Sequence, residues 1–520
     1  MITHTLQRRE WGSIPPLSIL FYPTMTAFNL IDNPWIPVRW HPSATGEKPR
    51  LVSLHDAFWR SREIADLDAA PHERIALTRL LVCIAHAALG APDDSDEWEN
   101  FGHDLEAATT SYLARPDIHP HFNLLGDGPR FLQEAVPEKG DAVSASKLFP
   151  RLATGNNPTV LDHGGMSASR SFEPSALALG LLTFQNFYPL YGAGYKGRGP
   201  CADANGIHCV LLGKHLRDTI IHNMLDAESL SRTAHESFGK PIWECKTPAE
   251  LEQSTQTLLG RLVPRHRSLR LASDLTGFFH SNKSLIYPNW EPHREPSVSI
   301  VINRKGDRRI APARLDRSIW RDLHHLTALR AGDETNPDAS LVLQSHREAL
   351  ENETVELWTG ALITDLKAKI LDTAESTFTV PRGMSGIAGR ALYTAGIEYA
   401  ELISTKLYGA IRTYGSSLSH EHPPVTEGQQ HYWHHLDQKH RELIALAAAP
   451  KPGQAAIGST GADDPWTLIV RTAAIAAYEA VCPRTTPRQI EAFALGYRPL
   501  HRALFPLPAK KTAAKKTATA

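Results

Sequence analysis

The sequence predicts an α+β protein with a large mixed N-terminal domain, built from short sheets and long loops, followed by a C-terminal four-helix bundle. Three observations predict it. The chain has 520 residues, of which 42% are hydrophobic, so it can bury two or more cores. From Thr26 to about Ser345, short β-rich runs alternate with helical segments and with loops rich in proline and glycine. After about Glu348, apolar residues recur at helical spacings.

The mixed domain is expected to begin with a strand hairpin. Phe28, Leu30 and Ile31 predict a buried strand that ends at an Asp-Asn-Pro turn, after which Trp35 and Pro37 anchor a second short strand.

Further elements follow along this domain. Residues 74–89 predict a buried helix with a broad apolar face, and Val298–Asn303 predicts a strand followed by a polar turn. Two loops are long enough to be functional or disordered rather than plain connectors: 137–175 and 189–209.

Four helices are expected in the C-terminal part, the first near Thr354–Thr373. Three more follow from apolar stripes on one helical face: Leu392, Ala395, Tyr399 and Leu402; Tyr432, Leu436, Leu443 and Ala447; Trp466, Val470, Ala473, Ala477 and Val481. Asp464 and Pro465 suit the N-cap and first turn of the last one. Long helices with short connectors are typical of a bundle.

We therefore divide the chain into four parts: an extension over 1–25, the mixed domain over 26–347, the helical bundle over 348–508 and a tail over 509–520. The extension is a poor signal peptide, because prolines interrupt its apolar stretch, and we expect it to be disordered. The tail is a low-complexity run of Ala, Lys and Thr. It is expected to be disordered, and either attracts nucleic acid weakly or only aids solubility.

Composition narrows the class of protein. The net charge is −1 with 26 neutral histidines, so the chain as a whole is not a general polyanion binder. The 5 cysteines never occur as Cys-x-x-Cys, which argues against a disulfide framework or a four-thiolate zinc site. No apolar run reaches the roughly 18 residues of a membrane span. We expect a cytoplasmic protein without metal, cofactor or membrane contact.

Positive charge is concentrated between residues 261 and 321. This window holds thirteen Lys and Arg residues against five Asp and Glu residues, a surplus of eight in a nearly neutral chain. Such a surplus is a candidate phosphate-facing surface. The alternative is a solvated basic face with ordinary ion pairs.

Patterns for catalysis are weak. His55-Asp56 and His103-Asp104 are compatible with a metal-dependent phosphohydrolase, but no spacing indicates the further ligands that such a site needs. His431 and His435 have ligand-compatible spacing without an accompanying glutamate, which favours a structural role. The sequence contains neither a Gly-x-x-x-x-Gly-Lys-Ser/Thr phosphate loop nor a Gly-x-Ser-x-Gly elbow.

One glycine-rich loop stands out, running from Tyr191 to Gly199. Glycine lets the backbone approach a ligand closely, and Lys196 and Arg198 offer phosphate partners. The loop is therefore a candidate for a minor-groove or phosphate contact, the alternative being a mobile surface loop.

The run Phe28-Asn29-Leu30-Ile31-Asp32-Asn33-Pro34-Trp35-Ile36-Pro37-Val38 resembles the opening of the large subunit of the type I-E CRISPR surveillance complex, Cascade (the CasA family). Residues 80–86 resemble that family's first apolar helix. The resemblance extends from about Thr26 to about Pro506 and is strongest in the first third. It implies the same order of mixed domain and four-helix bundle.

The resemblance also implies a function. A family member is a non-catalytic subunit that recognises the protospacer-adjacent motif (PAM) in duplex DNA and contacts the minor groove. It helps open the duplex so that guide RNA can pair in an R-loop, and it recruits a helicase-nuclease in antiviral defence. The implied partners are the backbone, small and guide-handle-binding subunits, CRISPR RNA, double-stranded target DNA and the helicase-nuclease.

Two DNA-contacting elements follow from the resemblance. The family's glycine loop corresponds to Gly192, Ala193 and Gly194 with Lys196 after them; Ala193 stands where a close relative has glycine, and its methyl group limits the approach of backbone to bases. The family's lysine finger follows a Thr-Gly-Phe signal and falls on Asn282 or Lys283. The lysine suits the negative potential of the minor groove better.

A third element, the wedge that pushes between base pairs, corresponds to residues 336–340. Asp338 stands where the family has glutamine. DNA repels a carboxylate, so either Asn336 takes this role or the wedge acts by its bulk.

A fourth element, the loop over residues 155–163, resembles the family loop that docks on the neighbouring subunit and the 5′ handle of the guide RNA. Val160 and Leu161 would form its apolar plug, with Asn157 and Asp162 as polar contacts. Some relatives carry paired Cys-x-x-Cys motifs before the finger, whereas this chain has no cysteine there. No structural zinc is therefore expected.

The leading hypothesis is thus a DNA-inspecting, non-enzymatic subunit of a guide-RNA complex. Two alternatives stay open from the residues alone: a metal-dependent nuclease or phosphohydrolase, and a purely architectural scaffold that never touches DNA.

Overall fold

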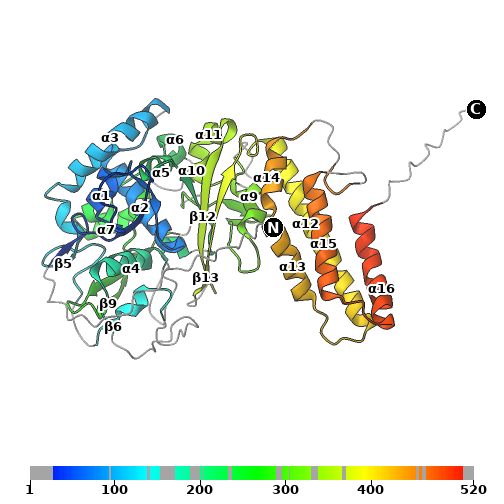
Figure 1. Ribbon diagram of the computed structural model, residues 1–520. Coiled ribbons are helices and arrows are strands. Elements are labelled where there is room, and N and C mark those ends of the chain that lie inside the picture. The colour runs from blue at the N-terminus through cyan, green and yellow to red at the C-terminus, as the bar shows by residue number, and fades with distance from the viewer. Residues whose placement is uncertain are drawn as a thin grey trace, which may run out of the picture.

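The computed structural model in Figure 1 describes most of the chain. The described residues are 27–92, 95–136, 141–152, 170–187, 199–202, 204–231, 237–288, 295–303, 305–329, 338–365, 370–451, 456–459 and 464–506. Helices and short sheets mix on the N-terminal side, coloured blue to green, and long helices, yellow to red, form the C-terminal side. The predicted α+β class is confirmed.

The two predicted N-terminal strands are present, but they do not form a hairpin with each other. The strands here are β1 (Phe28–Asn29), β2 (Ile36–Trp40), β3 (Leu51–Val52), β4 (Ile64–Leu67) and β5 (Asn123–Leu125). β1 pairs with β5, and β2 lies between β3 and β4. The turn between β1 and β2 is fixed by Trp35, whose indole N–H donates to the carbonyl of Leu30 at 3.0 Å.

The helix α2 (Pro71–Leu89) is the centre of the N-terminal side, and it confirms the helix predicted over residues 74–89. Its side chains are buried along most of its length. Helices α3 (Ser95–Leu113), α4 (Pro174–Phe187) and α8 (Leu258–Leu262) pack around it. A helix surrounded on all sides can be apolar all round, which explains its weak amphipathic pattern.

Two further small sheets lie on this side. Strands β6 (Val143–Ser144), β9 (Gly277–Ser284) and β8 (Arg267–Leu271) form an antiparallel sheet in the order β6-β9-β8. The strand predicted over residues 298–303 appears as β10 (Ile300–Ile302), which pairs with β11 (Arg308–Ile310).

The remaining helices of this side are short: α1 (Leu54–Trp59), α5 (Leu216–His222), α6 (Ala227–Ser231), α7 (Pro248–Ser254), α9 (Leu323–Leu326), α10 (Leu341–Ser345), α11 (Arg347–Asn352), and the 3₁₀ turns η1 (His119–Phe122), η2 (Ala145–Leu148), η3 (Pro200–Ala202), η4 (Ile242–Glu244) and η5 (Ile319–Asp322).

The helix predicted near Thr354–Thr373 is wrong. That stretch contains β12 (Val355–Thr364) and the start of β13 (Ile370–Val380), which with β7 (His208–Leu212) form a sheet in the order β13-β12-β7. β12 is buried continuously from Leu357 to Thr364, so it lacks the alternation that marks a half-exposed strand. A short apolar run cannot be told from a buried helix by periodicity.

Because β12 pairs with β7 from the mixed part, this hairpin belongs to that part by its hydrogen bonding. The C-terminal helices begin only at Ile387. The boundary expected at residue 348 therefore falls within the mixed part, and the first long helix lies after β13.

The C-terminal helices are α12 (Ile387–Ser417), α13 (Val425–Asp437), α14 (His440–Ala448), α15 (Pro465–Val481) and α16 (Pro487–Leu504). α12 contacts the four others, and α13 and α14 follow one another end to end (Figure 1). The predicted cap of α15 is confirmed, because the Asp464 carboxylate accepts from the Thr467 backbone N–H at 2.8 Å.

The apolar stripes predicted for α13, α14 and α15 lie on their buried faces. Tyr432, Leu443, Trp466 and Val470 are all fully buried. The stripe predicted on α12 is wrong, because Leu402 is 50% exposed and the buried face of this helix runs through Tyr393, Ile397 and Ile403 instead. Most of the buried apolar side chains form one continuous cluster that joins the mixed part to the C-terminal helices. In the part of the chain that the structure describes, no helix is both long and apolar enough to cross a membrane.

Replacing Trp466 by Ala should lower the free energy of unfolding by about 3–5 kcal/mol. Trp466 is 0% exposed, and its indole N–H donates to the Gly396 carbonyl at 2.9 Å. Leu468→Ala on the same helix is the control, because Leu468 is 50% exposed and should cost about 0.5 kcal/mol or less. Denaturant titration measures both, and equal losses would contradict the assigned packing.

Candidate nucleic-acid interface

The predicted glycine loop connects α4 to η3, and Gly192, Ala193, Gly194 and Lys196 lie outside the described residues. The two ends of the loop are described and touch each other. A Cβ on Gly199 would lie 2.3 Å from the backbone oxygen of Asn186, so only glycine permits this approach. The loop therefore leaves and re-enters the fold at one point.

The hairpin of β8 and β9, which carries Lys283, is bonded to the end of α4. Gln185 donates to the Arg267 carbonyl at 2.9 Å and accepts from the Arg267 N–H at 2.7 Å. The rings of Phe184 and Phe278 also meet, with centroids 5.9 Å apart. Thus two predicted DNA-contacting elements, the glycine loop and the lysine finger, start from the same packed base.

The side chain of Lys283 is exposed near the end of β9. Its own N–H donates to the Ser281 hydroxyl at 3.3 Å, which supports the local backbone. A second cation, Lys147 on η2, lies close enough to help burial lower the pKa of His280 on the same strand. The side chain of Asn282, the other predicted finger residue, lies outside the part of the chain that the structure describes.

A buried ion cluster lies beneath this base. The guanidinium of Arg79 on α2 pairs with the carboxylate of Glu295, and Arg261 Nε lies 3.5 Å from the other carboxylate oxygen. Their side chains are 4%, 1% and 1% exposed for Arg79, Glu295 and Arg261. Burial acts to raise the pKa of Glu295, but the charges of Arg79 and Arg261 outweigh it and lower this pKa.

Arg79 also connects this cluster to the loop base. Its Nε donates to Asn186 Oδ1 at 3.0 Å and to the Leu262 carbonyl at 3.1 Å, and its Nη2 donates to the Arg261 carbonyl at 2.6 Å. One guanidinium therefore ties together α2, the end of α4, α8 and the segment that starts at Glu295. We assign Arg79 a positioning role for the loop.

Near this cluster, Cys201, His208 and Glu295 bring their donor atoms within 4.8 Å of one another. A cation there would face two guanidiniums that already balance the Glu295 carboxylate. His208 Nδ1 is engaged with the Ser297 hydroxyl at 2.8 Å, and burial lowers the pKa of His208 to about 4. These residues fit a neutral polar cluster better than a metal centre.

Asp338, predicted at the wedge, is 1% exposed. Its backbone forms a bridge to Ile300, and its carboxylate accepts from Arg308 at 2.6 Å. A side chain buried in an ion pair does not reach a duplex, so its position argues against the predicted DNA contact. Asn336 lies outside the described residues.

The basic residues of the window over 261–321 do not all lie on one exposed surface. Arg261, Arg267 and Arg321 are buried, while Arg308 and Arg317 form ion pairs with carboxylates. Much of the positive charge of this window is therefore buried or ion-paired within the protein and does not face solvent. The exposed cations described in the window are Lys283, Lys305, Arg309 and Arg314.

Two further predictions concern the docking loop over residues 155–163 and the dipeptide His55-Asp56. Asn157, Val160, Leu161 and Asp162 of the docking loop lie outside the described residues. His55 Nδ1 lies 3.4 Å from Asp56 Oδ1, and the two side chains are 42% and 46% exposed.

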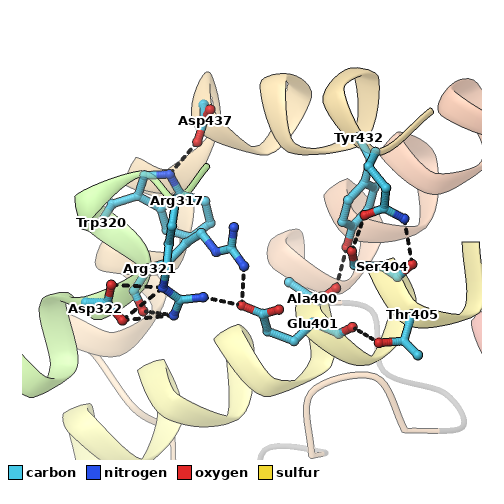
Figure 2. Close-up of polar contacts among 11 residues, drawn as sticks. Arg317, Trp320, Arg321, Asp322, Ala400, Glu401, Ser404, Thr405, Tyr432 and Asp437 are labelled. Atoms are coloured by element: carbon cyan, nitrogen blue, oxygen red, sulfur yellow. Dashed lines mark hydrogen bonds and ion pairs between the residues drawn. The ribbon is translucent and has the colours of Figure 1, made fainter. Parts of the chain in front are cut away.

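The joint between the mixed part and the C-terminal helices carries a second ion network, drawn in Figure 2. Arg317 donates to Glu401 of α12 at 2.6 Å, and Arg321 pairs with the same carboxylate. Trp320 of η5 donates to Asp437 of α13 at 2.6 Å. A groove of about 1680 Å³ lies alongside, between β13, η5, α12 and α13.

The sequence reasoning missed Arg79, Glu295 and Glu401. Arg79 carried a usable signal, because an arginine within an apolar helix needs a buried partner. Glu295 and Glu401 carried none, because only the folded chain shows which charges they meet.

These features define a two-part α+β protein in which an exposed cationic hairpin shares its base with a glycine loop. Residues 29–477 match the family model described as CRISPR-associated protein Cse1, so the chain belongs to this family.

Known relatives agree. The CRISPR-associated protein CasA/Cse1 of Thermus thermophilus is 26% identical, over 92% of this chain and 98% of that protein. The solved structure of Thermus thermophilus CasA (Cse1) matches with a TM-score of 0.72 at 23% identity, covering 92% of this chain and 99% of that one. The crystal structure of Thermobifida fusca Cse1 matches with a TM-score of 0.71 at 20% identity, covering 92% and 98%.

Replacing Arg79 by Met should lower the free energy of unfolding by about 3–5 kcal/mol, because it leaves Glu295 buried with one partner fewer. Arg62→Met is the matched control: Arg62 is 52% exposed in its pair with Glu106, and its loss should cost about 1 kcal/mol or less. Denaturant titration of both variants measures the difference. Similar costs would show that the buried cluster is not a structural centre.

The ion pairs of Glu401 at the joint should make the free energy of unfolding depend on pH. Burial acts to raise the pKa of Glu401, but the hydrogen bond and charge of Arg321, with those of Arg317, lower it below its ordinary 4.5. The charged form therefore stabilises the folded protein above pH 4.5, and this contribution is lost as the pH falls through the lower folded pKa.

Glu401→Gln should cost about 1 kcal/mol at pH 7, a modest loss because Glu401 is 39% exposed and solvent screens it. The difference from the wild type should vanish at acid pH. Glu398→Gln, an exposed position on the same helix, should show no such trend. Urea titration at several pH values measures the difference in the free energy of unfolding between each variant and the wild type. A difference for Glu401→Gln that does not change with pH would contradict the ion-pair assignment.

Proposed function

We propose that this chain is the large, non-catalytic subunit of a CRISPR RNA-guided surveillance complex of the type I-E Cascade kind. Membership of the Cse1 family over residues 29–477 carries the proposal. A chain of a solved CRISPR RNA-guided surveillance complex supports it, with a TM-score of 0.69 at 20% identity and coverage of 91% of this chain and 99% of that one.

In this role the chain inspects duplex DNA for the motif that flanks a target and helps open the duplex for pairing with guide RNA. It then recruits the helicase-nuclease. The shared base of the glycine loop and the β8–β9 hairpin supports this role, because the two predicted DNA-contacting elements can then act on one stretch of minor groove. Gly192, Ala193, Gly194, Lys196, Asn282 and Lys283 stay the predicted contacts.

The proposed partners are the other Cascade subunits, CRISPR RNA and double-stranded DNA in the cytoplasm. Residues 155–163 are proposed to dock on the neighbouring subunit and the guide handle. Recognition divides accordingly: the protein reads the flanking motif, and base pairing reads the rest.

The rival enzyme class gains little from the site. Of the residues that the structure describes, neither His55 nor Asp56 belongs to the group with metal-ligand spacing. A metal analysis and a cleavage assay on the purified chain separate the classes. Bound divalent metal, with cleavage lost in His55→Ala, would support the hydrolase.

The motif-reading role is tested in the assembled complex with duplexes that differ only in the sequence flanking the target. We expect affinity to vary at least tenfold among flanking sequences, since base-edge contacts discriminate by about 1–3 kcal/mol each. A scaffold that never touches DNA would show equal affinity for all of them, and that result would remove the proposal.

Lys283→Ala should weaken duplex binding by the assembled complex and lower the slope of log affinity against log salt by about 1, since one cation is lost. Lys196→Ala should do the same. Lys406→Ala is the control, because Lys406 is an exposed lysine on α12, at the other end of the molecule from β9 (Figure 1). Binding measured from low to high salt decides, and an unchanged slope for Lys283→Ala would place that lysine away from DNA.

A further inference from the structure

A separate pocket on the mixed part is lined by three arginines. It has a volume of about 280 Å³ and lies between residues 128–135, η4 and the strand β8. Arg130, Arg265 and Arg270 line it together with His121, and all four side chains are half-buried. Nothing in the proposed function uses this pocket.

One wall of the pocket is the outer edge of β8, whose other edge pairs with β9. The N–H of Glu134 donates to the Leu269 carbonyl at 3.0 Å, and Gln133 accepts from the Leu271 N–H at 2.9 Å. Because Leu269 and Leu271 are buried, the alternating strand points Arg270 to the opposite face. Hydrogen bonds between residues 133–134 and β8 therefore fix two walls of the pocket relative to each other.

The position of Arg130 is fixed by backbone acceptors. Its Nε donates to the Gly126 carbonyl at 2.9 Å and its Nη1 to the Leu271 carbonyl at 3.4 Å. Among the lining residues described, Glu134 is the only carboxylate, and it accepts a hydrogen bond from the Ser268 hydroxyl.

Arg265 and Arg270 are the two arginines of the pocket whose guanidinium groups are not engaged by other side chains of the described residues. Within the described ranges, neither guanidinium has an ion pair or a hydrogen bond to another residue, in contrast to Arg261 and Arg321 of the same basic window. Like charges gathered in a half-buried pocket repel one another, so an anion bound between them lowers the electrostatic energy.

The size of the pocket limits the anion. About 280 Å³ falls just below the range of roughly 300–1,000 Å³ for drug-sized ligands. A double helix does not enter a pocket of this size, whereas one phosphate with its sugar does. Guanidinium groups bind phosphate oxygens bidentately, which suits a pocket that several arginines line.

We propose that this arginine pocket, lined by Arg130, Arg265 and Arg270, binds one phosphate group. The phosphate is that of a single-stranded nucleic acid or of a free nucleotide. The site does not rest on the motif-reading proposal, and either can fail without the other.

The first test uses the full wild-type chain and needs no variant. Phenylglyoxal modifies accessible arginines, and peptide mass spectrometry reports the rate at each position. We expect inorganic phosphate, AMP or a six-nucleotide single strand, each at constant ionic strength set with chloride, to slow modification of Arg265 and Arg270 at least threefold. Arg309, which is exposed on β11, should react at an unchanged rate.

The probes separate the two sources of phosphate. Protection by AMP and phosphate but not by the strand assigns the pocket to a free nucleotide, whereas stronger protection by the strand assigns it to nucleic acid. Absence of protection with all three probes, or equal protection at Arg309, would overturn the proposal.

A variant pair provides the second test. The double variant Arg265→Gln/Arg270→Gln should bind the protecting probe at least tenfold more weakly, by fluorescence anisotropy for a labelled strand or equilibrium dialysis for AMP or phosphate. Arg309→Gln/Arg314→Gln loses the same charge from exposed positions outside the pocket and should stay within twofold of the wild type. Equal weakening in both double variants would reduce the effect to general charge and refute a built site.

Discussion

The buried ion cluster of Arg79, Glu295 and Arg261 is the constraint on which the rest of the interface depends. Burying a carboxylate is costly unless charge and hydrogen bonds compensate it, and here two guanidiniums do so in the centre of the mixed part. Arg79 then has donors left for the end of α4 and for α8. The end of α4 and the β8–β9 hairpin are in turn bonded to each other, so the point from which the glycine-rich loop starts is part of the packed fold.

The placement of positive charges, some buried in ion pairs and some exposed, explains how a chain of net charge −1 can serve a nucleic-acid complex. Several arginines of the basic window lie inside the protein, where they join segments distant in sequence. Arg317 and Arg321, for example, link η5 to Glu401 on α12 across the joint. Among the described residues of this window, the cations that stay exposed are Lys283, at the end of the hairpin, Lys305, Arg309 and Arg314. Local placement of charge therefore matters more for binding than the total does.

Sequence reasoning reached the fold class, the central helix α2, the cap at Asp464 and the apolar stripes of α13, α14 and α15, because each depends on local periodicity or capping. It failed at residues 354–373, since a strand buried on both faces lacks the alternation that marks a strand. It also placed Asp338 at a surface wedge, whereas a long-range bridge to Ile300 and a pair with Arg308 bury it. Partners far apart in sequence, such as those of Glu295, follow from tertiary packing alone.

The central claim is that the β8–β9 hairpin and the loop anchored beside it face duplex DNA in the assembled complex. Site-specific photocrosslinking tests it most directly, with a photoreactive residue placed at 283 or, as a reference, at 406 on α12. The account predicts crosslinks to the DNA next to the target from position 283 and none above background from position 406. Crosslinks from 406 alone would contradict it, because the contact would then lie on the C-terminal helices.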